Sequence, residues 1–310
     1  MAMFVVCGEA LMDVYMGEWT STGLTLDARV GGSPFNVAQG LARLERPVAF
    51  LTGLSTDASG ERLLASLRAE GVDTSLVLRG DAPSTLSVVS VDAAGVPRYA
   101  FHGKDAADRQ ITHETMPALP DATRVLQFGS YALAVEPVGS ALRALAARER
   151  ARRLIAYDLN VRLNVEPDLA HWRDVVGFMA PLAHLMKTSD EDLALLYPEE
   201  GPEQVAARWL GLGASLVVVT RGRDGASAWT REARADAPSP PITVVDTVGA
   251  GDTFQAALLA WLDEQDALTP QALAGLDAAA LQNALAFAAR AAALTCSRRG
   301  ADLPRRSELR

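Results

Sequence analysis

One stretch decides how this chain folds and what it can do: Val244-Val245-Asp246-Thr247-Val248-Gly249-Ala250-Gly251-Asp252-Thr253-Phe254. A β-branched run ends at a glycine-rich turn, and the turn opens a helix. The apolar residues of that helix recur at helical spacing, at Phe254, Ala257, Leu258 and Trp261. The glycines allow a ligand to approach the backbone closely, and the first helical N–H groups have no intrahelical partner. The stretch therefore predicts an anion site with the Asp252 carboxylate beside it.

Two interpretations of Asp252 follow. In phosphoryl transfer, the amides of Gly249, Ala250 and Gly251 hold the charge that develops on the phosphoryl group, while Asp252 accepts the proton of an attacking hydroxyl. In the alternative, Asp252 is a helix N-cap, because residues 252–255 loosely fit a capping box. The catalytic interpretation requires the carboxylate to be unburied and to face the open end of the sheet.

Composition narrows the class of protein. The chain has 310 residues, 49% of them hydrophobic and 22% charged, which is typical of a globular protein with a large core. A net charge of −9 argues against non-specific binding to nucleic acid or to an anionic membrane. No apolar run reaches the roughly 20 residues of a membrane span, and the N-terminus lacks a basic signal region. Cys7 and Cys296 are expected to be unpaired thiols in a reducing cytoplasm.

Short apolar runs alternate with helical periodicity, which favours a mostly parallel sheet with helices on both faces. Strands are predicted at residues 4–8, 48–53, 125–129, 154–158, 184–187 and 216–220. Helices are predicted at residues 33–46, 60–70, 138–152, 169–180, 202–210 and 281–296. Residues 231–241 are predicted to be a loop. Ligands of such sheets bind at the carboxyl ends of the strands.

Two segments interrupt the alternation, residues 11–29 and 85–112. They contain short alternating runs, and residues 91–101 indicate a hairpin with an Ala-Ala-Gly turn. A small sheet over one end of the main one is expected, serving either as a lid that excludes water or as an edge cap.

Polar residues follow several predicted strands. Asp13, soon after the first strand, suits a vicinal diol. Arg162, in Asp158-Leu159-Asn160-Val161-Arg162, is able to clamp a phosphate or a carboxylate through its planar fork. Glu9, in the same stretch as Asp13, is equally consistent with a solvated turn, and residues 158–162 are equally consistent with an exposed turn.

Three further stretches carry comparable alternatives. Gly31-Gly32-Ser33-Pro34-Phe35-Asn36 opens a helix, with Asn36 able to bind sugar hydroxyls and Ser33 a plain N-cap in the alternative. Lys187-Thr188-Ser189-Asp190-Glu191-Asp192 joins a strand to an acidic helix start, where an acid either organises Mg²⁺ through water or only favours the helix dipole. Residues 220–225 form a glycine-bearing turn, either a phosphate contact or a simple hairpin. There is no P-loop motif, and the four histidines are scattered.

Taken together, these stretches resemble the ribokinase/PfkB family of carbohydrate kinases, nearly end to end. Gly31-Gly32-Ser33-Pro34-Phe35-Asn36-Val37-Ala38 resembles the N-terminal signature of the family, and residues 246–254 closely resemble its C-terminal signature. Residues 158–162 and 187–192 look most like the fructokinase branch. The resemblance implies one ribokinase-like domain over residues 1–310, with a Rossmann-like core and a β lid.

The resemblance also implies ATP-dependent phosphorylation of a sugar hydroxymethyl with Mg²⁺. Asp252 would be the base, and Gly249, Ala250 and Gly251 the anion hole. The residues implied at the sugar are Asp13, Gly31, Gly32, Asn36, Phe101 and Arg162, and those implied at the nucleotide are Lys187, Ser189, Thr220, Gly222, Gly225 and Ala289, the last on the 287–292 helix. Asp246, the Val248 carbonyl and residues 293–300 match the monovalent-cation (K⁺) site of the family.

One departure concerns magnesium. Many family members carry Asn-x-x-Glu where this chain has Ser189 and Asp192, so the role of Asp192 through water rests on a shorter acid. D-Fructose is the expected substrate. 2-Keto-3-deoxygluconate, read by Arg162, a nucleoside or another sugar, and a catalytically silent sugar-binding regulator are the alternatives. A homodimer through the lid is a further expectation from the family.

Overall fold

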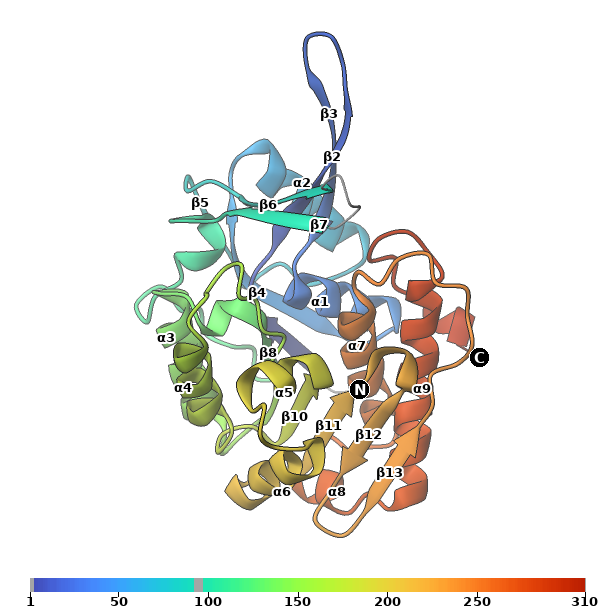
Figure 1. Ribbon diagram of the computed structural model, residues 1–310. Coiled ribbons are helices and arrows are strands. Elements are labelled where there is room, and N and C mark those ends of the chain that lie inside the picture. The colour runs from blue at the N-terminus through green and yellow to red at the C-terminus, as the bar shows by residue number, and fades with distance from the viewer. Residues whose placement is uncertain (1–2, 92–96, 310) are drawn as a thin grey trace.

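The computed structural model describes residues 3–91 and 97–309. Its main sheet has nine strands in the order β13-β12-β11-β10-β9-β8-β1-β4-β5 (Figure 1). The strands that the sequence predicts are β1 (Met3–Cys7), β4 (Val48–Ser55), β8 (Thr123–Gly129), β9 (Leu154–Asp158), β10 (Leu185–Ser189) and β11 (Leu216–Thr220). They pair in parallel, so their carboxyl ends meet at one edge. The predicted α/β class, with a mostly parallel sheet, is confirmed.

Three further strands lie at the ends of this sheet, and the hairpin alternative for residues 220–225 accounts for one of them, the strand at 226–229. β5 (Val77–Gly80) adds in parallel to β4, while β12 (Ala226–Trp229) and β13 (Arg234–Ala237) add antiparallel beyond β11. The prediction of a loop over residues 231–241 is wrong at 234–237. The exposed residues of β13 alternate with buried alanines, whose small side chains carry little hydrophobic signal.

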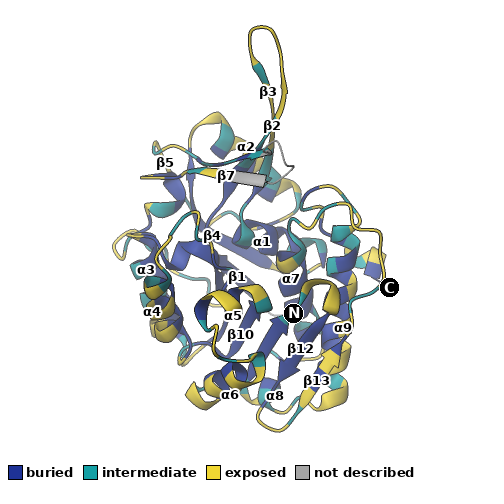
Figure 2. Cartoon of the chain, in the orientation of Figure 1, coloured by how far each residue is buried: buried dark blue, intermediate teal, exposed yellow. Residues whose placement is uncertain are grey.

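Helices cover both faces of the sheet, and Figure 2 shows the sheet buried between them. Alternating β1 side chains enter opposite cores: Phe4 and Val6 on one side, Val5 and Cys7 on the other. The first core is completed by α1 (Ser33–Arg43), α2 (Ala58–Ala69), α7 (Ala250–Glu264), α8 (Pro270–Ala274) and α9 (Ala278–Cys296). The second is completed by α3 (Val138–Glu149), α4 (Leu169–Met179), α5 (Asp190–Leu196) and α6 (Pro202–Leu212).

A second, four-stranded sheet has the order β3-β2-β6-β7. Its hairpins are β2 (Leu11–Trp19) with β3 (Leu24–Gly31) and β6 (Thr85–Val91) with β7 (Pro97–His102), joined by parallel pairing of β2 with β6. The predicted small sheet is thus present, although the expected turn at Ala93-Ala94-Gly95 lies outside the described residues. The β2–β3 hairpin projects well beyond the body of the molecule (Figure 1).

The stretch that opens the sequence argument folds as a turn followed by a helix. Gly249, in the left-handed conformation with φ 77°, precedes the first residue of α7. Val244 and Val245, which begin the stretch, belong to no strand and are 59% and 60% exposed. Their β-branched side chains therefore do not extend the sheet.

Within the described residues, no helix has the length and apolarity that crossing a bilayer requires.

Candidate active site

The Asp252 carboxylate is held by two residues from the start of α1. Ser33 Oγ donates to Asp252 Oδ1 at 2.6 Å, and Asn36 Nδ2 donates to Asp252 Oδ2 at 2.8 Å. The contact arises because α1 and α7 pack against each other and place their first turns together. Pro34, at the start of α1, suits this position because its missing N–H would have no intrahelical acceptor.

The structure excludes the capping interpretation of two residues. Asp252 is not the N-cap of α7, since Gly249 holds that position, and Ser33 is not the N-cap of α1, since Gly32 holds that one. The two side chains form a hydrogen bond with each other instead. The expectation of an unburied Asp252 is wrong, because the residue is only 8% exposed. Exposure was too strict a requirement, since burial is one of the ways in which active sites shift the pKa of a catalytic acid.

Burial changes the acidity of Asp252. Desolvation raises the pKa of its carboxyl, and the hydrogen bonds from Ser33 and Asn36 lower it, as does the positive charge of Arg162. Burial thus favours the protonated form of the carboxyl, and the hydrogen-bond donors favour its charged form. That balance suits a group that accepts a proton in the course of a reaction.

Two glycines shape the start of α7. A Cβ on Gly249 would lie 2.6 Å from the Ala301 Cβ, so close packing as well as its positive φ requires glycine there. A Cβ on Gly251 would lie 3.6 Å from Lys187 Nζ, which brings a buried cation to this helix start. The Ala250 N–H donates to the Thr247 carbonyl at 3.2 Å within the turn. A helix start with a nearby cation favours an anion.

Lys187, expected at the nucleotide, forms a buried ion pair. Its Nζ lies 2.6 Å from Asp158 Oδ2, and the two side chains are 5% and 4% exposed. Desolvation raises the pKa of the Asp158 carboxyl to about 6 despite the opposing charge of Lys187. The pair ties the ends of β9 and β10 together beneath the α7 turn.

Asp13, expected at the sugar, lies close to this cluster. Burial raises the pKa of its carboxyl to about 6, a hydrogen bond with Ser87 lowers it, and the charge of Asp252 raises it further. A Cβ on Gly31 would lie 2.4 Å from Asp13 Oδ2, so the glycine backbone makes room for this carboxylate. A Cβ on Gly32, which has φ 108°, would meet the Glu9 carbonyl oxygen at 2.9 Å.

Arg162 is the cation that these acids share. Its charge lowers the pKa values of Glu9, Asp13 and Asp252. Its Nη1 donates to the Val161 carbonyl at 2.9 Å, which fixes the side chain near the end of β9. The predicted proximity of Asp13, Arg162 and Asp252 at one edge of the sheet is therefore present in the structure.

Phe101 contacts a group of residues that sequence reasoning missed. Its ring packs edge-on against Tyr131 at 5.3 Å, and the Arg109 guanidinium lies over both rings at 5.5 and 5.4 Å. Asp108 accepts hydrogen bonds from Thr85 Oγ1 at 2.5 Å and Tyr131 OH at 3.0 Å. The group links the four-stranded sheet to the main body.

Glu9 is a further buried acid near the same edge, so the solvated-turn interpretation of this residue is wrong. It is 1% exposed, and burial raises the pKa of its carboxyl to about 8, with a hydrogen bond to Ser130 opposing that shift. Its Oε2 has no hydrogen-bond partner among the described residues. The position directly after β1 was the one available signal.

A cavity of about 400 Å³ brings together four of the residues expected at the nucleotide. Residues of the β11–β12 turn, of α9 and of the α7 start line it, including Thr220, Gly222, Gly225, Ala289, Ala250 and Gly251. Its other walls are mostly apolar, with Pro240, Pro241 and Ile242 on the irregular segment between β13 and α7. An apolar cleft that ends at a helix N-terminus matches a flat ring joined to phosphates.

Ser189 and Asp192 are committed to local structure. Ser189 Oγ accepts from the Asp192 N–H at 3.0 Å and caps α5, and Asp192 Oδ1 accepts from the Val161 N–H at 3.1 Å. Within residues 3–91 and 97–309, no group of three or more His, Cys, Asp and Glu side chains is placed to hold a metal ion. A magnesium ion here would depend on phosphate oxygens and water, as is usual for that ion.

Asp246 joins the two segments expected at a monovalent cation. Its Oδ1 accepts from the Val248 N–H at 3.1 Å, and its Oδ2 accepts from the Gly300 N–H at 2.8 Å. Behind them, the Thr253 and Thr295 hydroxyls lie 2.8 Å apart and link α7 to α9. The carboxylate thus organises the backbone of both segments beside the α7 turn.

Comparison with known proteins agrees with this geometry. The family model for the pfkB family carbohydrate kinases matches residues 1–308. A fructokinase from Rhizobium leguminosarum bv. trifolii is 40% identical over 281 residues, covering 91% of this chain and 86% of that protein.

Two solved structures extend the likeness to three dimensions. A Xylella fastidiosa fructokinase with bound ATP superposes with a TM-score of 0.89 at 26% identity, covering 99% of this chain and 96% of that one. A double-mutant fructokinase from Vibrio cholerae O395, with fructose, ADP and a potassium ion bound, gives a TM-score of 0.84 at 25% identity, covering 100% and 97%. The chain belongs to the pfkB family of carbohydrate kinases.

Proposed function

We propose that this carbohydrate kinase is a fructokinase, which transfers the γ-phosphoryl group of ATP to the hydroxymethyl group of D-fructose and releases fructose 6-phosphate and ADP. One observation carries the proposal. The Asp252 carboxylate, which accepts hydrogen bonds from Ser33 and Asn36, lies at the glycine-rich start of α7, and the same helix start lines the 400 Å³ cavity. The proposed base is therefore adjacent to the proposed phosphate site. The curated fructokinase at 40% identity supports the choice of sugar.

In the proposed reaction, the sugar hydroxyl oxygen forms a bond to the γ-phosphorus, and the bond from that phosphorus to the β,γ-bridging oxygen breaks. Asp252 accepts the hydroxyl proton. The amides of Gly249, Ala250 and Gly251 stabilise the charge on the phosphoryl oxygens. Because the transition state of phosphoryl transfer is loose, positioning by these groups contributes more than the basicity of the carboxylate.

The sugar and the nucleotide have separate proposed contacts. Asp13 and Asn36 would hold sugar hydroxyls, with Gly31 and Gly32 giving them room and Phe101 forming an apolar wall. Arg162 neutralises the acids of the site. Thr220, Gly222, Gly225 and Ala289 would enclose ATP, while Lys187 acts on the anion site from beneath the α7 turn.

Two ions belong to the proposal. Mg²⁺ would bind the phosphates, with Asp192 reaching it through water and Ser189 fixing the α5 start. A K⁺ ion would bind beside Asp246 and the Val248 carbonyl. The potassium ion in the Vibrio cholerae structure and the Asp246 contacts with Val248 and Gly300 support the second ion.

The direct test is ADP release measured with D-fructose, ribose, 2-keto-3-deoxygluconate and adenosine under identical conditions. The proposal expects the highest kcat/KM with fructose. Faster turnover of 2-keto-3-deoxygluconate would assign Arg162 to a substrate carboxylate and overturn the choice of sugar. Sugar binding without ADP release from any substrate would instead indicate a silent regulator.

A homodimer through the lid is also proposed. The β2–β3 hairpin is largely exposed (Figure 2), and it carries Trp19 and Leu26 at 77% and 58% exposure. Large apolar side chains on a projecting hairpin favour a protein contact. Light scattering should give twice the mass of one chain, and Trp19→Ser with Leu26→Ser should reduce it to that of one.

A cytoplasmic location is also proposed, and the free thiols of Cys7 and Cys296 support it.

A further inference from the structure

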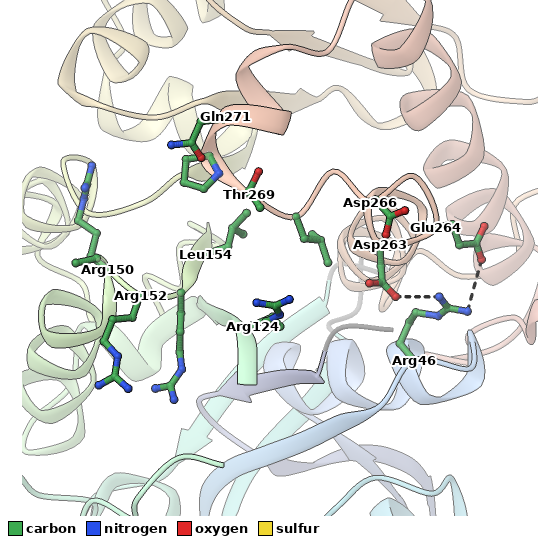
Figure 3. Close-up of a pocket in the computed structure, with 14 residues that line it drawn as sticks. Arg46, Arg124, Arg150, Arg152, Leu154, Asp263, Glu264, Asp266, Thr269 and Gln271 are labelled. Carbon is green, nitrogen blue, oxygen red and sulfur yellow. Dashed lines mark hydrogen bonds and ion pairs between the residues drawn. The ribbon is translucent and has the colours of Figure 1, made fainter. Parts of the chain in front are cut away.

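A second large cavity lies at the opposite end of the main sheet from the candidate active site. It has a volume of about 650 Å³ and is bordered by the amino ends of β8 and β9, by the residues that precede β4, and by the chain that follows α7 (Figure 3). Five of its lining residues are arginines, namely Arg46, Arg124, Arg150, Arg152 and Arg153. No part of the proposed reaction uses this cavity.

Two of these arginines are neutralised within the protein. Arg46 Nη1 lies 2.9 Å from Asp263 Oδ2, an ion pair drawn as a dashed line in Figure 3. Arg153 pairs with Glu149 and donates to the carbonyls of Thr123 and Pro120. These contacts fix two walls of the cavity and leave little positive charge on them.

The other three arginines have no such neutralisation. Among the described residues, no carboxylate forms an ion pair with Arg124, Arg150 or Arg152, although Arg150 Nε donates to the Pro181 carbonyl at 2.9 Å. Figure 3 shows Arg124 between the Arg150–Arg152 wall and the wall of Asp263 and Asp266. Arg124 and Arg152 are exposed and Arg150 is half-buried. Solvent therefore screens part of their mutual repulsion, and a bound anion would reduce it further.

The acidic lining does not supply that anion. Asp263 is engaged by Arg46, and Glu264 by Arg306 at 2.9 Å. Asp266 alone of the three lining acids forms no ion pair among the described residues, and it is exposed. The cavity therefore keeps an excess of positive charge in a chain whose net charge is −9.

We propose that this cavity binds a compact polyanion bearing two or more phosphate groups. A volume of 650 Å³ lies within the usual range of small-molecule sites, roughly 300–1,000 Å³. The planar fork of a guanidinium matches phosphate oxygens through paired hydrogen bonds, and several unpaired forks around one hollow select multiple charges over one.

The test uses inorganic pyrophosphate as the probe, titrated calorimetrically into the full chain with excess ADP present throughout to occupy the nucleotide cavity. Pyrophosphate should bind the unmodified protein. Arg124→Ser with Arg152→Ser should weaken that binding by about tenfold or more, because two charge-assisted contacts are lost. Arg62→Ser is the matched control, since Arg62 is an exposed arginine of α2 outside the cavity, and it should bind as the unmodified protein does.

A second variant tests whether the net positive charge of the cavity drives the binding of the anion. Asp266→Asn removes the free acid at a positive-φ position that asparagine tolerates, so pyrophosphate should bind more tightly by about threefold or more. Absence of binding to the unmodified protein would overturn the proposal, as would equal binding by the Arg124/Arg152 double variant with an unchanged melting temperature. Because no phosphoryl transfer is measured, these outcomes are independent of the proposed kinase reaction.

Discussion

The side-chain amide of Asn36 donates a hydrogen bond to the Asp252 carboxylate at 2.8 Å, across a separation of 216 residues. The bond joins the first turn of α1 to the first turn of α7, and Ser33 adds a second bond from the same turn. The position of the proposed base is therefore set by a helix that carries proposed sugar contacts. Substrate recognition and proton transfer share one rigid unit.

Asp252→Asn should reduce kcat by about 100-fold or more, because the amide keeps the shape of the carboxylate but cannot accept the proton. The KM for the sugar should change little, since Asp13 and Asn36 remain. Steady-state kinetics of ADP release measures both constants. Near-normal turnover would remove Asp252 from the proposed mechanism.

Ser33→Ala should move the acid limb of the pH–rate profile upward by about one pH unit, because a hydrogen bond to a charged group contributes roughly 1.5–3 kcal/mol. The Ser33 bond lowers the pKa of Asp252, so its loss lets that pKa rise and the active, ionised form disappears at a higher pH. The control is Ser66→Ala, whose hydroxyl bonds Gln39 instead. Superimposable profiles of the two variants would contradict the role given to Ser33.

Lys187→Met should destabilise the protein by roughly 3–5 kcal/mol at neutral pH, because it leaves the Asp158 carboxylate buried without its cation. Adding Asp158→Asn should recover a large part of that loss, since the uncompensated charge is then gone. Denaturant unfolding of both variants provides the comparison. If the double variant is no more stable than the single one, Lys187 stabilises the fold by some means other than this pair.

His184→Asn should flatten the loss of stability in acid. Burial lowers the pKa of His184 to about 4, and its Nδ1 accepts a hydrogen bond from the Ile155 N–H at 3.0 Å. An unfolded histidine binds its proton near pH 6.5, so stability is lost as the pH falls from about 6.5 to 4. The unmodified protein should lose on the order of 2 kcal/mol more than the variant over that range. Unfolding curves at pH 7 and pH 4.5 measure the difference.

Gly249→Ala should impair both folding and turnover. The substitution forces a side chain into φ 77° and into contact with Ala301, which would displace the α7 start. Gly177→Ala is the contrasting control, because that glycine lies within α4 with nothing near its Cβ position, and alanine there should add about 0.5–1 kcal/mol of stability. Normal kcat in Gly249→Ala would show that the α7 turn tolerates displacement.

Much of the fold could be predicted from local pattern. Buried strands such as β1 and β11 are continuous apolar runs, and helices such as α3 and α9 show clear periodicity, so both appear in the sequence within a few residues of their observed bounds. β13 and β5 could not be found in this way, because edge strands bury too few large apolar side chains to show a pattern. Their existence depends on a neighbouring strand that offers hydrogen bonds.

The sequence by itself determined the glycine turn before α7 and the acid that follows it, because each depends on neighbours within a few residues. It also determined the parallel class of the sheet, because strands that alternate with helices along the chain can pair only through crossovers. Only the tertiary structure decided that Asp252 is buried against Ser33 and Asn36, that Lys187 is paired with Asp158, and that Glu9 is buried away from solvent. Desolvation and long-range hydrogen bonds arise from which helices and strands pack together. Residues far apart in sequence acquire their chemistry from that packing.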